Sequence, residues 1–300
     1  MQVVRVHGKS PAQEGGLLRG DRLTRINGQA VDDLSAEATA ERLRGEPGTL
    51  VEVEFVRPGE VGPRRTVKLL RRAVAMTSVE TRMLALDDGS PVGYLAIQQF
   101  QESTLVEVQD ALATLMGMGG EPIKGLILDL RGNPGGLFKS AVAVAELFIA
   151  DGVVVIGQSP LREYNRPFRA EGGMPVPLPT VVLIDAETAS AAEVLAGALK
   201  DVRTPRFPTR LLGQTTYGKG SIQCIIPMDK PPFDNLAGVR LTVARLLSPT
   251  NQPITGRGIT PHVPSDREGE ALLLEARKHL LDLIAPGMAP RPMDMPGGAS

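Results

Sequence analysis

The sequence is poor in the residues that most often build covalent cross-links and metal sites. It has a single cysteine, Cys224, so no disulfide can form within the chain. Its three histidines, His7, His262 and His279, lie far apart, and no spacing typical of metal ligands accompanies them. We therefore expect a protein stabilised by packing, with no metal and no cofactor.

Long apolar runs are also missing, as is an excess of charge of one sign. No stretch approaches the roughly 18 apolar residues of a membrane span, and the N-terminal residues lack the pattern of a signal peptide. The 33 basic and 34 acidic residues give a net charge of -1, without long runs of like charge. Nucleic acid and anionic membranes are therefore poor candidate partners, and a protein or a small molecule is expected.

What the sequence does have is enough apolar residues for two globular units. The chain has 300 residues, of which 42% are hydrophobic. Residues 1–72 alternate short β-like runs with turns and hold one helical stretch, 35–44. Asn27 and Gly28 indicate a tight turn, since both tolerate a positive φ. Strands are expected at 3–6, 20–28, 51–56 and 66–69.

From Pro91 the pattern becomes an alternation of apolar strands and helices. Near-continuous Val, Ile and Leu strands separated by helices indicate a sheet buried on both faces. We expect this α/β domain to occupy residues 73–284. The tail that follows, 285–300, is rich in Pro, Gly, Met and Ala without a periodic pattern, and we interpret it as disordered. The expected elements are strands at 93–97, 125–130 and 180–184, helices at 103–116 and 139–149, and loops or short edge strands at 161–179.

Segment 184–199 joins a buried strand to a helix through small residues and places Ser190 at the helix start. Free backbone N–H groups and the positive end of the helix dipole can stabilise a developing oxyanion there. A serine nucleophile needs this geometry. The alternative is that Ser190 caps the helix while the alanines pack closely on the sheet, which is the commoner role of a serine in such a place.

A serine nucleophile also needs a base, and none of the three histidines lies in a convincing setting. A lysine can replace histidine when desolvation lowers its pKa enough to accept a proton near neutral pH. Lys219 stands between Gly218 and Gly220, where the backbone can approach closely and the ammonium need not reach solvent. Taken alone, Gly-Lys-Gly is more often an exposed turn.

Together, the two segments closely resemble the carboxy-terminal processing (tail-specific) serine peptidase family. In that family a Thr-Ala-Ser-Ala-x-Glu segment carries the nucleophile, and a Thr-(Phe/Tyr)-Gly-Lys-Gly-x-(Val/Ile)-Gln segment carries the base. Residues 188–193 and 216–223 match these segments. The resemblance implies that Ser190 is the nucleophile, Lys219 the general base and Gln223 the side chain that orients the lysine.

A third segment, 129–136, resembles the family's Asp-Leu-Arg-x-Asn-Pro-Gly-Gly turn. In the family this turn offers a backbone N–H to the tetrahedral intermediate. We expect the oxyanion hole at the amides of Gly136 and Ala191, with Gly135 as the near alternative, since glycine permits close approach. A phosphate-binding turn is the other interpretation, but the spacing fits neither the P-loop nor the dinucleotide fingerprint.

The resemblance extends over roughly residues 1–280, with two departures. Segment 256–263 is similar to a Gly-x-Gly-Ile-x-Pro-Asp-x ending, but His262 replaces the usual aspartate. Surface drift is the simpler interpretation, and a catalytic His262 is the alternative. Residues 202–210 lengthen the interval between the two catalytic segments, and we interpret them as a loop insertion that leaves both motifs whole.

The first unit resembles a PDZ domain. Segments 10–12, 15–17, 20–21 and 26–28 match the middle of that domain. The first strand and the carboxylate-binding loop of a PDZ domain would precede residue 1, so we expect an N-terminally incomplete β-rich PDZ domain. A variant or permuted small β module is the alternative.

The resemblance implies a fold and a function. The fold is an α/β catalytic domain of crotonase/ClpP-like type, with a mixed sheet and flanking helices, preceded by the partial PDZ domain. The function is that of a serine endopeptidase, which cleaves protein substrates at or near their C-terminal region with a Ser-Lys dyad. Apolar C-terminal tails of proteins are the expected partners, bound by strand addition, and no metal or cofactor is implied.

The location typical of bacterial members is extracytoplasmic, in the periplasm or cell envelope. Two rival functions stay open at this point. One is a non-proteolytic PDZ-containing protein that binds protein tails, and the other is an acyl-CoA enzyme on a related fold. The second would not need both Lys219 and a PDZ-like module.

Overall fold

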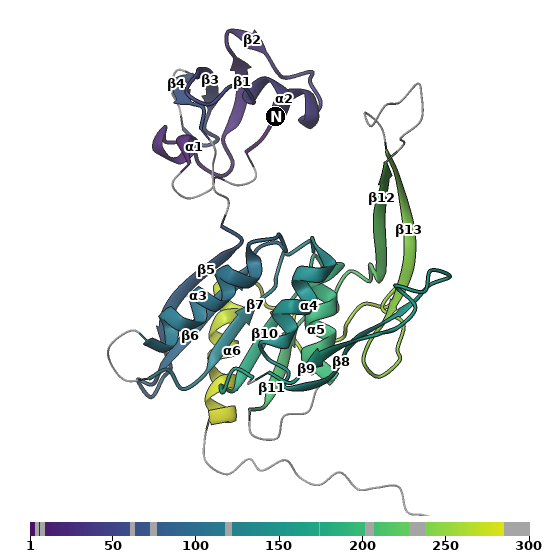
Figure 1. Cartoon of the computed structure of the whole chain (residues 1–300). Helices are drawn as coiled ribbons and strands as arrows, with labels where there is room; N and C mark the ends of the chain where they lie inside the picture. Colours follow the sequence, from purple (N-terminus) through teal and green to yellow (C-terminus); the bar gives the residue numbers. More distant parts are fainter. Residues whose placement is uncertain are drawn as a thin grey trace, which may run out of the picture. The chain divides into compact units, whose positions relative to one another are not determined.

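The computed structural model describes residues 1–284 except 4–5, 7–9, 61–63, 73–76, 118–121, 174, 202–206 and 228–237. The chain divides into two compact units, Met1–Met76 and Thr77–Ser300 (Figure 1). This division falls a few residues after the one predicted from the sequence. The tail predicted to be disordered, 285–300, lies outside the described residues.

The first unit is a small antiparallel sheet with two short helices. Its sheet has the strand order β2-β1-β3-β4. The β1–β2 turn is formed by Asn27 and Gly28, both with positive φ, as predicted. In β3 every second residue is buried, as is typical of a sheet with one face on a core. The elements are α1 (Pro11–Glu14), β1 (Arg22–Ile26), β2 (Gln29–Ala30), α2 (Ala36–Leu43), β3 (Leu50–Val56) and β4 (Arg65–Leu70).

Two sequence predictions for this unit need comment. Helix α2 begins after Ser35, whose hydroxyl accepts the amide of Ala38 at 3.1 Å, so the predicted N-terminal serine does cap the helix. The strand predicted at 3–6 is not seen at Val3 or Val6, and residues 4 and 5 lie outside the described part.

The second unit is built on a mixed six-stranded sheet. The strand order is β14-β11-β10-β7-β6-β5, in which β5 runs antiparallel to β6 and the other neighbours are parallel. The predicted mixed sheet is therefore present. Its strands are β5 (Val79–Ala85), β6 (Pro91–Ile97), β7 (Leu126–Asp129), β10 (Thr180–Ile184), β11 (Thr209–Gly213) and β14 (Val263–Pro264).

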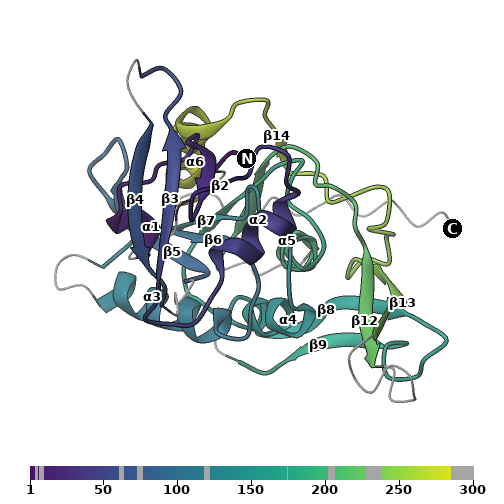
Figure 2. The ribbon, with the colours of Figure 1, turned by 90° about the horizontal axis from the view of Figure 1, so that it is seen from above.

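Helices cover both faces of this sheet. In β10, Val182 and Ile184 pack in one core with helices α3, α4 and α5. Val181 and Leu183 of the same strand pack in a second core with α6. Figures 1 and 2 show α6 on the opposite face of the sheet from the other three. The helices are α3 (Thr104–Gly117), α4 (Phe138–Glu146), α5 (Ala191–Asp201) and α6 (Gly269–Ile284). The apolar strands are thus buried on both faces.

A second, four-stranded sheet was not predicted from the sequence. Its order is β12-β13-β8-β9, with every neighbouring pair antiparallel. Strand β9 lies in the proline-rich segment, where short edge strands were one expectation. Strands β12 and β13 form a hairpin that stands out from the α/β layers (Figure 1). The four strands are β8 (Asp151–Gln158), β9 (Pro167–Glu171), β12 (Ser221–Pro227) and β13 (Gly238–Leu247).

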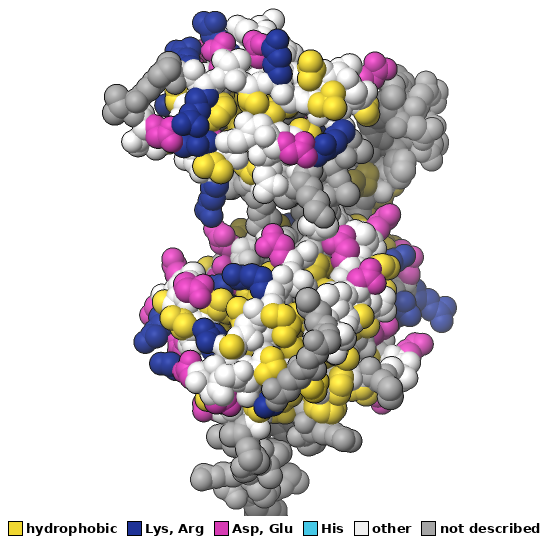
Figure 3. Space-filling model, turned by 90° about the vertical axis from the view of Figure 1, so that its left-hand side faces the viewer, with side chains coloured by type: hydrophobic (Ala, Val, Ile, Leu, Met, Phe, Trp, Pro, Cys, Tyr) yellow, Lys and Arg dark blue, Asp and Glu magenta, His cyan; other side chains and the backbone are white. Residues whose placement is uncertain are grey.

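The surface carries charges of both signs. Lys and Arg side chains are interspersed with Asp and Glu side chains over the face shown in Figure 3. This mixture agrees with the near-neutral net charge of the chain. Among the described residues, no helix combines the length and the apolar character needed to cross a membrane.

Candidate active site

The three predicted catalytic segments follow neighbouring parallel strands. Segment 130–136 follows β7, segment 185–190 follows β10 and segment 214–220 follows β11. Because β7, β10 and β11 are adjacent and parallel, their carboxyl ends lie at one edge of the sheet. This edge is where α/β sheets place their ligands. The fold therefore brings the segments together.

Hydrogen bonds join these segments directly. The hydroxyl of Thr188 donates to the carbonyl of Leu130 at 2.9 Å, and the amide of Ala189 donates to the carbonyl of Asn133 at 2.9 Å. The amide of Tyr217 donates to the carbonyl of Thr188 at 3.0 Å. The serine segment is thus bonded to the glycine-rich turn on one side and to the lysine segment on the other.

Ser190 lies immediately before α5 in an unusual backbone conformation. Its φ is 57°, in the left-handed region that residues other than glycine rarely adopt. Such strain persists where the surroundings impose it, and it is found preferentially at functional sites. Within the described part of the chain, the Ser190 hydroxyl makes no hydrogen bond, so it does not cap the helix. The hydroxyl is left available for chemistry.

A buried carboxylate connects the serine and lysine segments. Glu193 is fully buried, with 0% of its surface exposed. Its Oε2 accepts the amides of Ser190 at 2.7 Å and Lys219 at 2.8 Å. Its Oε1 accepts the amide of Gly218 at 2.7 Å and the hydroxyl of Thr216 at 2.6 Å. The backbones of Ser190 and Lys219 therefore meet at one oxygen atom.

Glu193 is the last residue of the predicted serine segment, 188–193, but no role was predicted for it from the sequence. The signal that could have found it is its position three residues after Ser190. A glutamate in this position commonly reaches back to the backbone N–H at the start of a helix. Glu193 does so here by accepting the amide of Ser190, and it also accepts the amide of Lys219 in the lysine segment.

The side chains of Lys219 and Gln223 are exposed, contrary to the desolvation expected for the lysine. The backbone amide of Lys219, rather than its ammonium, bonds the buried carboxylate. Gln223 lies in β12 just after a shift in register, opposite Thr242. In the described part of the chain neither side chain forms a hydrogen bond. The predicted contact between them is therefore absent from this conformation.

The two backbone amides predicted for the oxyanion hole, those of Gly136 and Ala191, are both available as hydrogen-bond donors within the described part of the chain. Gly136 has a φ of 134°, and its amide donates no hydrogen bond among the described residues; the same holds for the amide of Ala191. The amide of Gly135, the alternative donor, is already bonded to Oδ1 of Asn133 at 2.8 Å. A Cβ on Gly135 would lie 2.8 Å from the Cβ of Ser190, so the turn and the serine are in close contact.

A buried network supports the glycine-rich turn from below. The hydroxyl of Tyr94 donates to Oδ2 of Asp129 at 2.8 Å, and Arg131 bonds both oxygens of the same carboxylate. Burial, with the Asp129 charge second, raises the pKa of Tyr94 to about 12. Arg131 also donates to the carbonyl of Gly269 at 2.9 Å, which ties the turn to the start of α6.

His262 has a different partner from the one that catalysis would require. Its Nδ1 accepts the amide of Leu211 at 3.0 Å, and its own amide donates to the carbonyl of Leu211 at 3.0 Å. Both contacts are to the backbone of β11. His262 therefore links the segment before β14 to β11, and these backbone contacts count against the catalytic alternative.

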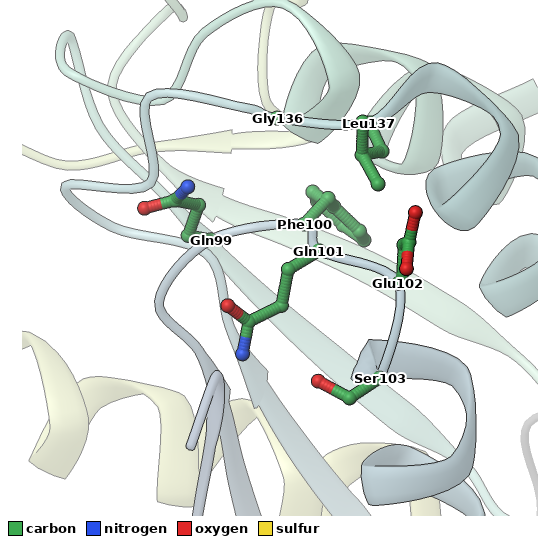
Figure 4. A pocket seen from close by; sticks show the side chains of 7 residues that line it. All are labelled: Gln99, Phe100, Gln101, Glu102, Ser103, Gly136 and Leu137. Atoms are coloured by element: carbon green, nitrogen blue, oxygen red, sulfur yellow. The ribbon is translucent and has the colours of Figure 1, made fainter. Parts of the chain in front are cut away.

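A cavity of about 520 Å³ opens beside Gly136 (Figure 4). It lies where β6 leads into α3, at the same edge of the sheet as the catalytic segments. In the described residues no group of three or more His, Cys, Asp or Glu side chains is placed to hold a metal ion. The residues that line the cavity are Gln99, Phe100, Gln101, Glu102, Ser103, Gly136 and Leu137.

Comparisons with known families agree with this geometry. Residues 91–265 match the model of peptidase family S41, and residues 2–57 match a PDZ domain model. The resemblance predicted from the motifs is therefore confirmed. The match over 91–265 includes the segments that carry Ser190, Lys219 and Gly136.

Similar proteins include several processing proteases. The carboxy-terminal processing protease CtpA of Bacillus subtilis is 34% identical over 257 residues, which are 86% of this chain and 51% of that protein. The carboxyl-terminal-processing protease of Synechocystis sp. is 34% identical over 252 residues, 84% of this chain and 56% of that protein. The chain thus spans about half the length of these relatives.

Solved structures show the same fold. The photosystem II D1 C-terminal processing protease superposes with a TM-score of 0.56 at 32% identity, covering 91% of this chain and 71% of that one. A structure described as an S41 protease from Bacteroides fragilis superposes with a TM-score of 0.59 at 18% identity, covering 94% and 77%.

Proposed function

Because the chain belongs to peptidase family S41, we propose that it is a serine endopeptidase that cleaves proteins at or near their C-terminal region with a Ser190–Lys219 dyad. The observation that carries this proposal is the Glu193 carboxylate, which bonds the amides of both residues through one oxygen. The names of the two relatives described above, both processing proteases, support it. The crotonase/ClpP-like class predicted for the catalytic domain is part of the same proposal.

The reaction is hydrolysis by acyl transfer. Ser190 attacks the scissile carbonyl while neutral Lys219 takes its proton, and the amides of Gly136 and Ala191 bind the oxyanion. Lys219 gives this proton to the leaving amine as the C–N bond breaks, which releases the first product and leaves the acyl-enzyme. Water then attacks the acyl-enzyme, with Lys219 taking its proton and returning it to Ser190 as the second product leaves. The exposed side chain of Lys219 must turn toward the serine and present an unprotonated amine for the first step, and the four rotatable bonds of a lysine allow this reorientation. Gln223 would then orient the amine.

The first unit supplies substrate binding in this proposal. A PDZ domain captures an extended C-terminal tail by adding it as a strand to a sheet edge. We assign apolar protein tails as its ligands. An extracytoplasmic location, in the periplasm or cell envelope, goes with this proposal and rests on the family resemblance.

The test compares casein hydrolysis by the intact chain with that of Ser190→Ala and Lys219→Ala. We expect both variants to lose at least ~10³-fold in rate, since members of a catalytic pair act as a unit. Lys278→Ala, an exposed lysine on α6, is the matched control and should keep the parental rate. A serine-reactive fluorophosphonate probe should label the parent and not Ser190→Ala.

A parent chain that neither cleaves casein nor reacts with the probe would overturn the proposal in favour of a non-proteolytic tail-binding protein. The exposed Lys219 side chain is the observation that keeps this second function in view. Turnover of acyl-CoA thioesters without peptide cleavage would instead indicate the acyl-CoA enzyme.

A further inference from the structure

The cavity beside Gly136 is directly continuous with the proposed oxyanion site. Phe100 and Gly136 form an isolated parallel β-bridge, in which the amide of Phe100 donates to the carbonyl of Gly135 at 2.8 Å. The amide of Leu137 donates to the carbonyl of Phe100, also at 2.8 Å. One wall of the cavity is therefore the backbone that presents the free Gly136 amide. A peptide carbonyl bound to that amide would place a neighbouring side chain beside the cavity, because Gly136 also lines the cavity.

The cavity combines an apolar floor with one charge. Phe100 is 1% exposed, whereas Leu137 is 47% exposed although it is a large apolar residue. Figure 4 shows the side chains of Leu137 and Glu102 pointing toward one another, with Phe100 beside them. Of the seven lining residues, Glu102 is the only ionisable one. Among the described residues no ion pair or hydrogen bond involves this exposed carboxylate, and a carboxylate at the rim of an apolar pocket favours a cation.

The wall that carries Glu102 is held in place by a buried hydroxyl. Thr104 is 0% exposed, and its Oγ1 accepts the amide of Gln101 at 2.9 Å and contacts the hydroxyl of Ser78 at 2.7 Å. The Glu107 carboxylate in turn accepts the amide and the hydroxyl of Ser78. These contacts fix the backbone next to Glu102, so the segment that carries the exposed carboxylate needs little reordering on binding.

We propose that this cavity is a specificity pocket for the substrate side chain next to the scissile bond, and that Glu102 makes it select lysine and arginine. The aliphatic part of such a side chain packs on Phe100 and Leu137, and its cationic end reaches the Glu102 carboxylate. This inference rests on the proposed peptidase function and adds a substrate class to it.

The experiment maps cleavage sites in casein by mass spectrometry for the parent, Glu102→Gln and Glu102→Lys. Glu270→Gln is the matched control, since Glu270 is an exposed acid in the first turn of α6, on the other face of the sheet. In the parent and the control we expect lysine and arginine to be enriched at one position adjoining the cleaved bond. Glu102→Gln should lose the enrichment, and Glu102→Lys should replace it with aspartate and glutamate.

A peptide pair built on one mapped site gives the magnitude. Lysine is compared at the selected position with norleucine, which keeps the aliphatic stem and lacks the charge. We expect kcat/KM to favour lysine about five-fold in the parent, the size typical of a partly exposed ion pair, and not at all in Glu102→Gln.

The outcomes distinguish a failure of the pocket assignment from a failure of the proposed peptidase function. Cleavage with the same site preference in the parent, Glu102→Gln and Glu102→Lys would overturn the pocket assignment and leave the peptidase standing. Absence of cleavage by the parent, with no difference from Ser190→Ala, would overturn the proposed function and the pocket assignment with it.

Discussion

At the scale of single residues, the site depends most on Glu193, which carries no proposed chemical role. A buried carboxylate is costly unless hydrogen bonds replace its lost hydration. Three backbone amides and one hydroxyl do so here, and they come from both catalytic segments. The charge is therefore stable only while Ser190 and the lysine segment stay in place, which makes Glu193 a positioning residue for both.

We predict that Glu193→Gln lowers both stability and activity. The amide has almost the shape of the carboxylate, but its NH₂ group would face N–H donors instead of accepting from them. Leaving such buried donors unpaired costs about 1–3 kcal/mol each. We expect a loss of about 2–4 kcal/mol in the free energy of unfolding by urea denaturation.

The activity of the same variant distinguishes positioning from general destabilisation. At a temperature where Glu193→Gln is still folded, kcat should fall at least ~10²-fold with little change in KM, because the substrate pocket does not include this residue. Glu187→Gln, at an exposed glutamate in the loop that precedes α5, should be near the parent in both measurements. A variant with parental kcat would contradict the positioning role.

At the scale of elements, the residue just before the edge strand β14 makes a pH-sensitive contact with β11. His262 belongs to an exposed stretch, yet its Nδ1 accepts the Leu211 amide, so this nitrogen must carry no proton. Desolvation, together with the charges of Lys200 and Arg210, lowers the pKa of His262 from its ordinary value of 6.5. The folded chain therefore binds this proton less readily than the unfolded chain.

We predict that this contact makes the second unit less stable in acid. The contribution is fully present above about pH 6.5 and is lost as the pH falls through the lower folded pKa. His262→Asn keeps an acceptor near the amide but cannot titrate. Thermal unfolding at several pH values between about 5 and about 8 should show a steeper loss of Tm in the parent than in the variant. Equal slopes would contradict this prediction.

Three of the six strands of the large sheet, β6, β7 and β10, could be predicted from the sequence because their signal is local, whereas β5, β11 and β14 were not predicted. Strands such as β10, at 180–184, are continuous apolar runs, and the structure places β10 at the predicted residues. Sheet β12-β13-β8-β9 was not predicted, because its hairpin strands are half-polar and because β13 pairs with β8, which lies far away in the chain. Strand β13 begins with five exposed residues, so its apolar pattern is weak.

The candidate site was predictable in part for a related reason. Ser190, Lys219 and the glycine-rich turn stand in recognisable segments, and parallel strands bring the ends of such segments to one edge. The orientation of Lys219 could not be predicted, because it depends on which of its groups bonds Glu193. The cavity at Glu102 could not be predicted either, because its walls come from segments that are distant in sequence.

At the scale of the whole molecule, the chain contains separate hydrophobic cores. One core lies entirely in the first unit, around Ile26, Val53 and Phe55. The two cores on either side of the large sheet lie entirely in the second unit. Each unit thus has the apolar packing that an independent fold requires.

We therefore predict that residues 77–300 fold without the first unit. The isolated fragment should unfold in urea in one cooperative transition, with the same midpoint as the second unit in the full chain. The first unit should unfold at lower urea, since a domain of its size buries a smaller share of its surface. Failure of the fragment to unfold cooperatively would mean that the second unit depends on the first.

The connection between Asp201 and Thr209 joins the end of α5 to the start of β11. Ser190 and Lys219 lie at the opposite ends of these two elements, across the full length of the sheet. The long interval between Ser190 and Lys219 therefore does not affect the positions of these two residues. The helix and the strand fix both of them whatever the length of the connection. Lengthening such a connection costs only about 0.6 kcal/mol per doubling. The same position is accordingly a suitable place to insert a reporter peptide into a working enzyme.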